Sequence, residues 1–113
     1  MKFKKLCLFF VLVPLPSLAL EPVTEQDTDC LSYWQLRSVG LSREYGIASA
    51  KLSDQYNRQY QSSLQVLKSA HEPKVLVAKM YQSMGKLLEK IDNDYQRTAE
   101  LDAEYIKGCP LDK

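Results

Sequence analysis

Two cysteines, Cys30 and Cys109, lie near the two ends of the part of this chain that has helical sequence patterns. A disulfide between them would bring the start and the end of the fold together, which is a strong constraint on a small domain. The alternatives are a zinc site, which needs four closely spaced ligands, and a redox pair, which usually reads Cys-x-x-Cys. The chain has neither pattern, so we expect a structural Cys30–Cys109 disulfide. The third cysteine, Cys7, lies in a leader sequence.

The first 19 residues have the three parts of a secretory signal peptide. Three lysines precede an apolar run at residues 6–13, and the small residues Ser17 and Ala19 stand at the −3 and −1 positions for cleavage. A retained membrane anchor is the alternative, but Pro14 interrupts the run well before the ~20 apolar residues that a spanning helix needs. We therefore expect cleavage after residue 19, and a periplasmic or secreted protein.

Charge and length narrow the class of protein. Cleavage would remove three of the 15 Lys and Arg and none of the 14 Asp and Glu, which leaves a net charge of −2. A near-neutral chain of mixed sign lacks the basic stripe of a nucleic-acid-binding protein. We expect no contact with nucleic acid, and none with membranes after cleavage. The remaining length suits an extended segment at 20–28 and a single helical domain at 29–113.

Apolar residues after Cys30 recur every three or four positions, as on one face of a helix. An eleven-residue recurrence, typical of a nearly straight helix, joins Trp34, Tyr45, Tyr56 and Leu67. Thr28 or Asp29 would cap the start of this helix. Pro73 ends the pattern near residue 70, because proline disfavours helical geometry in the residue before it.

A second apolar stripe starts at Pro73 and predicts a helix that ends at Gly108, where Pro110 prevents continuation. The turn between the two helices falls near His71, and Cys30 and Cys109 are almost equally far from it along the chain. Residues equally distant from a turn become neighbours in an antiparallel pair. We therefore predict an all-α fold, a disulfide-stapled antiparallel helical hairpin.

A break in the first arm is an equally good interpretation. Gly40 and Gly46 each cost ~1 kcal/mol in a helix interior, and Ser42 could cap a new helix. The arm would then be a short helix at 29–39 followed by a long one at 42–70. Apolar residues beside the main stripes need a cover, which would be the folded-back short helix, a second copy, or another protein.

The side chains that could act in catalysis do not form a recognisable catalytic set. We therefore expect a non-enzymatic protein without a cofactor. His71, the single histidine, falls at the predicted turn with no nucleophile motif to pair with. Late in the second arm, Asp102 falls on the inner stripe, where we expect it to pair with Arg37. The other carboxylates nearby are interspersed with basic residues, as on a solvated helix surface: Asp92, Asp94, Glu100 and Glu104.

The sequence favours function through protein–protein contact, as an inhibitor, an immunity-type factor or an adaptor of the cell envelope. The partner is another protein or a second copy of the chain. Tyrosines with amide neighbours are good interface material, and the predicted partner-binding residues are Trp34, Tyr45, Tyr56 and Tyr60. The alternative is a ligand- or metal-carrying bundle that binds Cu(I) through the thioethers of Met80 and Met84, which are four residues apart.

Overall fold

A computed structural model describes residues 22–112. The helices are α1 (Glu25–Ser42), α2 (Ile47–Ala70), α3 (Pro73–Lys90), the 3-10 helix η3 (Tyr95–Leu101) and the short α4 (Asp102–Tyr105). These residues form helices and turns without strands, which confirms the all-α prediction. None of these helices has the length and apolar content that crossing a bilayer requires. The predicted signal peptide lies outside the described residues.

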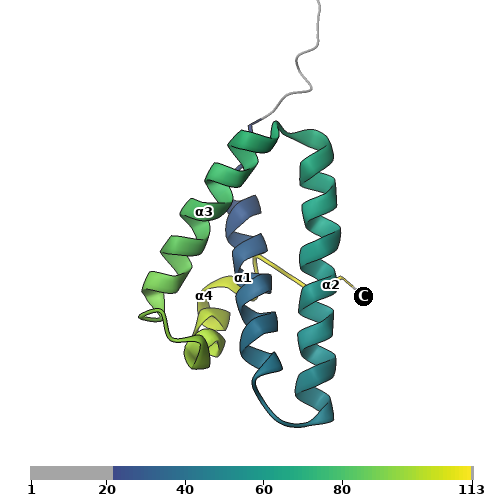
Figure 1. The fold of residues 1–113 in the computed structure, drawn as a ribbon, viewed down its shortest axis with the longest axis vertical. Helices are drawn as coiled ribbons and strands as arrows, with labels where there is room; N and C mark the ends of the chain where they lie inside the picture. The colour runs from purple at the N-terminus through teal and green to yellow at the C-terminus, as the bar shows by residue number, and fades with distance from the viewer. Residues whose placement is uncertain (1–21, 113) are drawn as a thin grey trace, which may run out of the picture.

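Helix α1 is the central element of the domain. It packs against α2, α3 and η3, whereas α2 and α3 make few contacts with each other. Figure 1 shows α1 between the other two long helices, which meet at the turn that joins them. Most side chains of α1 are buried, because neighbours surround it on several sides. The first arm is therefore broken, and its N-terminal part folds back to cover the apolar surface.

The break lies at residues 43–46, and its cause is Gly46. This glycine has φ 120°, a region that residues with a side chain rarely adopt, and α2 begins directly after it. Gly40, by contrast, stays within α1. The predicted boundaries at residues 39 and 42 were therefore too early, because the sequence does not show which of the two glycines interrupts the helix.

Helix α1 begins four residues before the predicted start at Asp29, so the extended segment is shorter than expected. Thr24 is the N-cap: its hydroxyl accepts a hydrogen bond from the Asp27 amide, and the Asp27 carboxylate accepts one from the Thr24 amide. This reciprocal pair is a capping box. The predicted caps, Thr28 and Asp29, are buried within the helix.

The predicted continuous second arm was wrong. Helix α3 ends at Lys90, and the next turn contains Asp92 and Asn93 with φ 55° and 57°. Aspartate and asparagine tolerate this left-handed conformation better than most residues, and two in succession end a helix. Ile91, which is fully buried, anchors the turn. The chain then reverses into η3 and α4, which pack beside α1 (Figure 1).

The disulfide is confirmed, with the Cα atoms of Cys30 and Cys109 5.3 Å apart. It does not join the open ends of two long helices. It joins α1 to the segment after α4, so it holds the C-terminal segment against the central helix. Trp34 supports this attachment, because its indole Nε1 donates a 3.0 Å hydrogen bond to the carbonyl of Cys109.

The expected pair of Arg37 and Asp102 is also confirmed. Arg37 Nε lies 3.0 Å from Asp102 Oδ1, and the same oxygen accepts a 2.6 Å hydrogen bond from the Tyr33 hydroxyl. Arg37 also donates from Nη1 to the Thr98 hydroxyl, at 3.3 Å. These contacts connect α1 to η3 and α4 across the interior of the domain.

Gly40 permits the close approach of η3 to α1, and we predict that Gly40→Ala destabilises the domain. A Cβ at this position would lie 2.0 Å from Thr98 Oγ1, with Thr98 Cβ and Cγ2 at 3.1 and 3.2 Å. Rotating the threonine would move Oγ1 and Cγ2 but not Cβ, and it would break the hydrogen bond from Arg37 to the Thr98 hydroxyl. Overpacking of this kind costs about 1–3 kcal/mol.

Thermal unfolding of Gly40→Ala checks this prediction, with Gly85→Ala as the matched control. Gly85 lies within α3, and a Cβ there would have no neighbour within 4 Å. In a sample dilute enough for each chain to unfold as a single copy, the control should therefore gain about 1 kcal/mol from helix propensity alone. A Gly40→Ala protein at least as stable as the wild type would show that α1 and η3 do not pack this closely.

Candidate functional site

A mainly apolar groove lies between α2 and α3, with α1 as its floor. Its volume is about 340 Å³. The groove is lined by Leu31, Ser32 and Gln35 of α1, Tyr60 of α2, and Val77, Met80, Tyr81 and Met84 of α3. We call it the α2–α3 groove. It exists because α1 holds α2 and α3 apart over most of their length.

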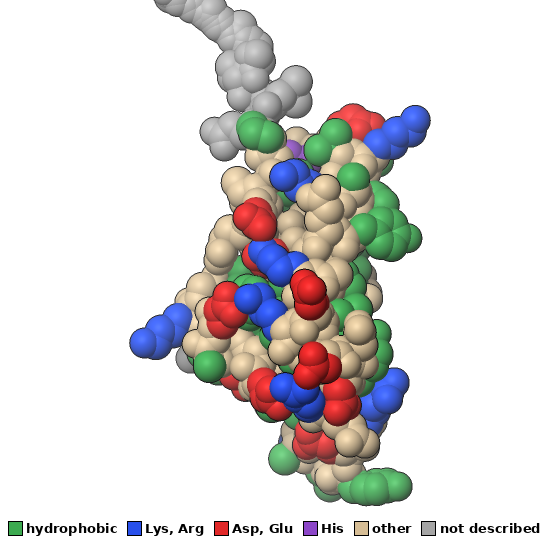
Figure 2. All heavy atoms as spheres, turned by 90° about the vertical axis from the view of Figure 1, so that its left-hand side faces the viewer, with side chains coloured by type: hydrophobic (Ala, Val, Ile, Leu, Met, Phe, Trp, Pro, Cys, Tyr) green, Lys and Arg blue, Asp and Glu red, His purple; other side chains and the backbone are tan. Residues whose placement is uncertain are grey.

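One wall of the α2–α3 groove follows from the sequence of α3. Val77, Met80, Tyr81 and Met84 stand at intervals of three and four residues, so they share one side of the helix. Tyr81 is 77% exposed and Val77 is 48% exposed, so much of their apolar surface remains open to a partner. Figure 2 shows hydrophobic side chains gathered along one vertical edge of the molecule, beside a face rich in charged groups.

The floor of the groove combines a rigid apolar base with two polar groups. Leu31 is 1% exposed and belongs to the core, so it does not move independently of the fold. The hydroxyl of Ser32 and the side-chain amide of Gln35 are the polar groups at this level of the groove. Few polar groups in a mainly apolar hollow are typical of binding sites for another molecule.

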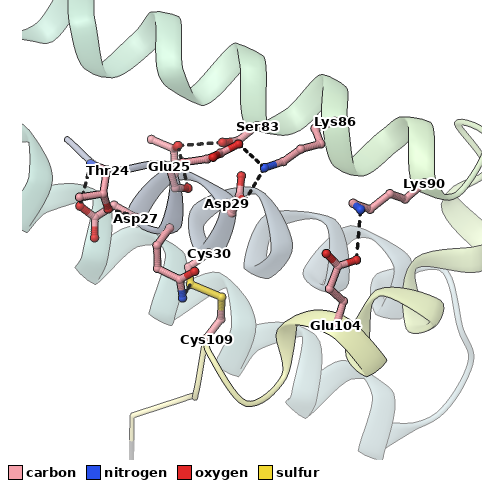
Figure 3. A network of polar contacts seen from close by, with 12 residues as sticks. Thr24, Glu25, Asp27, Asp29, Cys30, Ser83, Lys86, Lys90, Glu104 and Cys109 are labelled. Atoms are coloured by element: carbon pink, nitrogen blue, oxygen red, sulfur yellow. Dashed lines mark hydrogen bonds and ion pairs between the residues drawn. A yellow bond between two sulfur atoms is a disulfide. The ribbon is translucent and has the colours of Figure 1, made fainter. Parts of the chain in front are cut away.

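A polar network holds α3 against α1 on another side of α3. Lys86 Nζ donates hydrogen bonds of 2.6 Å to Glu25 and 2.7 Å to Asp29, and the buried hydroxyls of Thr28 and Ser83 are 2.7 Å apart. Figure 3 shows Lys86 and Ser83 of α3 facing Glu25 and Asp29 of α1 between the two helices. The hydrogen bonds to Asp29 and Glu25 raise the pKa of Lys86, and Lys86 in turn lowers the pKa of Glu25. The network fixes the position of the groove wall.

The structure does not bring the four predicted partner-binding residues together. Trp34 and Tyr56 are buried, and the edge of Trp34 lines a separate hollow of about 420 Å³ beside Cys30. Tyr56 lies edge-on to Tyr33, with the ring centroids 5.8 Å apart. Tyr45 is fully exposed in the loop between α1 and α2, and Tyr60 alone lines the groove. That these four residues contact a partner stays a prediction.

Met80 and Met84 lie together on the wall of the α2–α3 groove. His71 caps the C-terminus of α2, at the turn where the sequence placed it. Between residues 22 and 112, no group of three or more His, Cys, Asp and Glu side chains is arranged to hold a metal ion. The two thioethers are therefore the soft ligands that the groove offers.

The acidic residues late in the chain are engaged in the structure of the domain. Arg97 pairs with Asp92 at 2.7 Å and with Glu100 at 2.8 Å, and Lys90 pairs with Glu104 at 3.1 Å. The Asp94 side chain caps η3 by accepting a hydrogen bond from the Gln96 amide. These contacts agree with the predicted mixed-charge surface.

Sequence reasoning did not identify Leu31, Gln35 and Tyr81 as site residues. Tyr81 gave a usable signal, because it stands four residues after Val77 and widens the apolar stripe of α3 beyond what one neighbouring helix can cover. No comparable signal marked Leu31 or Gln35. Their place in the groove depends on the folding back of α1.

Comparisons with family models, with curated proteins and with solved structures returned no match to this chain.

Proposed function

We propose that this protein is a non-enzymatic binding protein of the periplasm or the cell exterior, and that its α2–α3 groove receives an apolar segment of a partner protein. The observation that carries the proposal is the groove itself, an apolar hollow with a rigid floor and an exposed aromatic side chain on its wall. The Cys30–Cys109 disulfide supports the compartment, because such bonds persist in oxidising environments.

The shape of the groove suits a helix. Three long helices already lie side by side, and a fourth in the groove would cover α1 between α2 and α3, as in a four-helix bundle (Figure 1). An amphipathic helix presents apolar side chains at i, i+3, i+4 and i+7, the spacing that binding in a groove uses. Covering Val77 and Tyr81 would contribute about 1.5–3 kcal/mol for each side chain that becomes fully buried.

The roles that fit such a protein are an inhibitor, an immunity-type factor or an adaptor of the cell envelope. Each of them acts by occupying or presenting a surface of another protein. The groove supplies apolar contact, and the half-buried side-chain amide of Gln35 supplies a hydrogen-bonding group that fixes the register of the bound segment. This division between apolar contact and a few polar groups gives affinity together with specificity.

Photo-crosslinking in the producing cells tests the proposal. A benzophenone amino acid at position 60 replaces Tyr60 on the groove wall. The same amino acid at position 45 replaces Tyr45, an exposed tyrosine in the loop between α1 and α2 that does not line the groove. From position 60 we expect one discrete adduct with a foreign protein. From position 45 we expect no adduct of the same mass. The adduct should be lost when Met80→Glu and Met84→Glu place carboxylates on the groove wall.

Adducts of the same foreign protein from both positions, or none from position 60, would contradict the groove as the binding site. The adduct masses also separate a foreign partner from a second copy of the chain.

The alternative function is a Cu(I) carrier, and the observation in its favour is that Met80 and Met84 share one wall of the groove. Cu(I) prefers soft sulfur ligands. The groove offers only two of them, the thioethers of Met80 and Met84, which is a small ligand set. Titration of the oxidised protein with Cu(I) tests this function, with Met80→Leu plus Met84→Leu as the control of nearly equal volume. Binding tighter than micromolar that the control abolishes would replace the groove proposal with the copper carrier.

A further inference from the structure

We propose that the outward side of α3 is a self-association surface, on which α3 of a second copy packs antiparallel. This goes beyond the proposed function, because the surface is separate from the floor of the α2–α3 groove. Its residues are spaced alternately by four and three positions, as at a helix–helix contact: Lys74, Ala78, Tyr81, Gly85 and Leu88. All except the half-buried Leu88 are exposed.

The surface is apolar and hollowed. A shallow hollow of about 450 Å³ is lined by Pro73, Lys74, Val77, Ala78 and Tyr81, and Tyr81 projects beside it. Ala78 directly follows Val77 and Gly85 directly follows Met84, so the surface lies about 100° around α3 from those groove residues. Val77 and Tyr81 stand between the two surfaces and border both of them.

Gly85 has no function within the single domain that the structure shows. A Cβ there would meet nothing within 4 Å, and the residue lies in the interior of a regular helix. Glycine at such a position costs about 1 kcal/mol relative to alanine. A close approach of another backbone accounts for this cost, because the small residues Ala78 and Gly85 let two helix axes come near each other.

Charge identifies the occupant as a second copy. Lys74 stands at the start of α3 and Glu89 near its end, about 22 Å apart along the helix, so they cannot meet within one chain. Neither takes part in an ion pair within residues 22–112. An antiparallel second copy brings Lys74 of each chain beside Glu89 of the other chain. Both charged residues then gain an ion-pair partner.

The register of this pairing follows from the same positions. Lys74 and Glu89 are symmetric about a point between Tyr81 and Gln82, and so are Ala78 and Gly85. A two-fold axis at that point sets Lys74 against Glu89 of the second copy and Ala78 against Gly85 of the second copy. One register therefore pairs the opposite charges and the small residues together. The dimer would present two α2–α3 grooves, so that a partner with two binding segments would bind with greater avidity.

Light scattering on a sizing column tests the proposal with the oxidised protein. We expect the wild type to have the mass of a dimer. Lys74→Glu or Glu89→Lys alone would place like charges together at both ends of the interface, and should raise the dissociation constant of the dimer about tenfold. The double variant, with both substitutions, should return to the wild-type value, because the charges are exchanged and remain complementary.

The weaker dimer expected of the single variants would not be due to unfolding of the chain. Glutamate near the start of α3 and lysine near its end both favour the helix dipole, so each single variant should melt no lower than the wild type within its own chain. Lys51→Glu on α2 is the matched control: it reverses an exposed lysine that forms no ion pair in the described part of the chain, and it should leave the mass unchanged. Gly85→Gln should also weaken the dimer, although it raises the helix propensity of α3.

A wild-type protein that is monomeric at every concentration would overturn the proposal. A double variant that stays as weak as the single variants would also overturn it. Both results are independent of the groove, because the adduct from position 60 identifies a foreign protein by its mass whether or not the chain is dimeric.

Discussion

Replacing both cysteines, Cys30→Ser with Cys109→Ser, is expected to lower the free energy of unfolding by ~4–5 kcal/mol while the protein remains helical at low temperature. The bond closes a loop with a sequence separation of 79 residues, and its removal restores the conformational freedom of the unfolded chain. A domain this small has little other stability to lose. Denaturant unfolding followed by circular dichroism measures the difference.

The reduced wild type is the control for the serine variant. Both lack the bond, so both should unfold at nearly the same denaturant concentration. In the oxidised protein Trp34 donates to the Cys109 carbonyl and Gln26 Nε2 donates to the Gly108 carbonyl at 2.9 Å. We expect both hydrogen bonds to remain without the disulfide, so the C-terminal segment keeps some attachment. Equal stability of the serine variant and the oxidised wild type would show that the bond does not hold the domain together.

Asp102→Leu is expected to cost about 3–5 kcal/mol, because it leaves the guanidinium of Arg37 buried without its carboxylate. The Arg37 side chain is 8% exposed, so water cannot replace the lost partner. Tyr33 loses the carboxylate that accepts its 2.6 Å hydrogen bond and keeps only the Tyr56 hydroxyl, at 3.3 Å. Burial and the hydrogen bond to Asp102 raise the pKa of Tyr33 well above its ordinary range, so its hydroxyl remains a donor near neutral pH.

A double-mutant cycle with Arg37→Met isolates the pair. Arg37→Met alone should cost less than Asp102→Leu, because the Asp102 side chain is 31% exposed and keeps the Tyr33 hydroxyl as a donor. The double variant should cost less than the sum of the two single variants, since two apolar side chains can share the vacated space. Strict additivity in denaturant unfolding would mean that Arg37 and Asp102 do not interact in solution.

The features that the sequence predicted correctly depend on local patterns and on pairs. Helical periodicity located α2 and the start of α3, and the lack of a zinc or Cys-x-x-Cys pattern identified Cys30 and Cys109 as a disulfide pair. The position of Asp102 on the inner stripe was enough to pair it with Arg37. In each case the residue types are restricted, because a buried charge or a disulfide requires a specific partner.

The features that the sequence missed depend on the choice between competing local signals. Thr24 and Thr28 are both acceptable caps, and only the reciprocal contact with Asp27 decides between them. Asp92 and Asn93 are exposed polar residues that a helix also tolerates, so their left-handed turn has no distinct signal. The α2–α3 groove could not be predicted, since its floor depends on where α1 packs after the break at Gly46.

The most direct test of the groove as a binding site is an NMR measurement on the methyl groups of methionine. Met80 and Met84 both line the groove, and the chain has one other methionine, Met1. The protein is labelled at the methionine methyl groups and mixed with the foreign protein captured at position 60. We predict that both the Met80 and Met84 resonances shift as the partner saturates the groove. A partner that binds while both resonances stay unchanged would contradict the account.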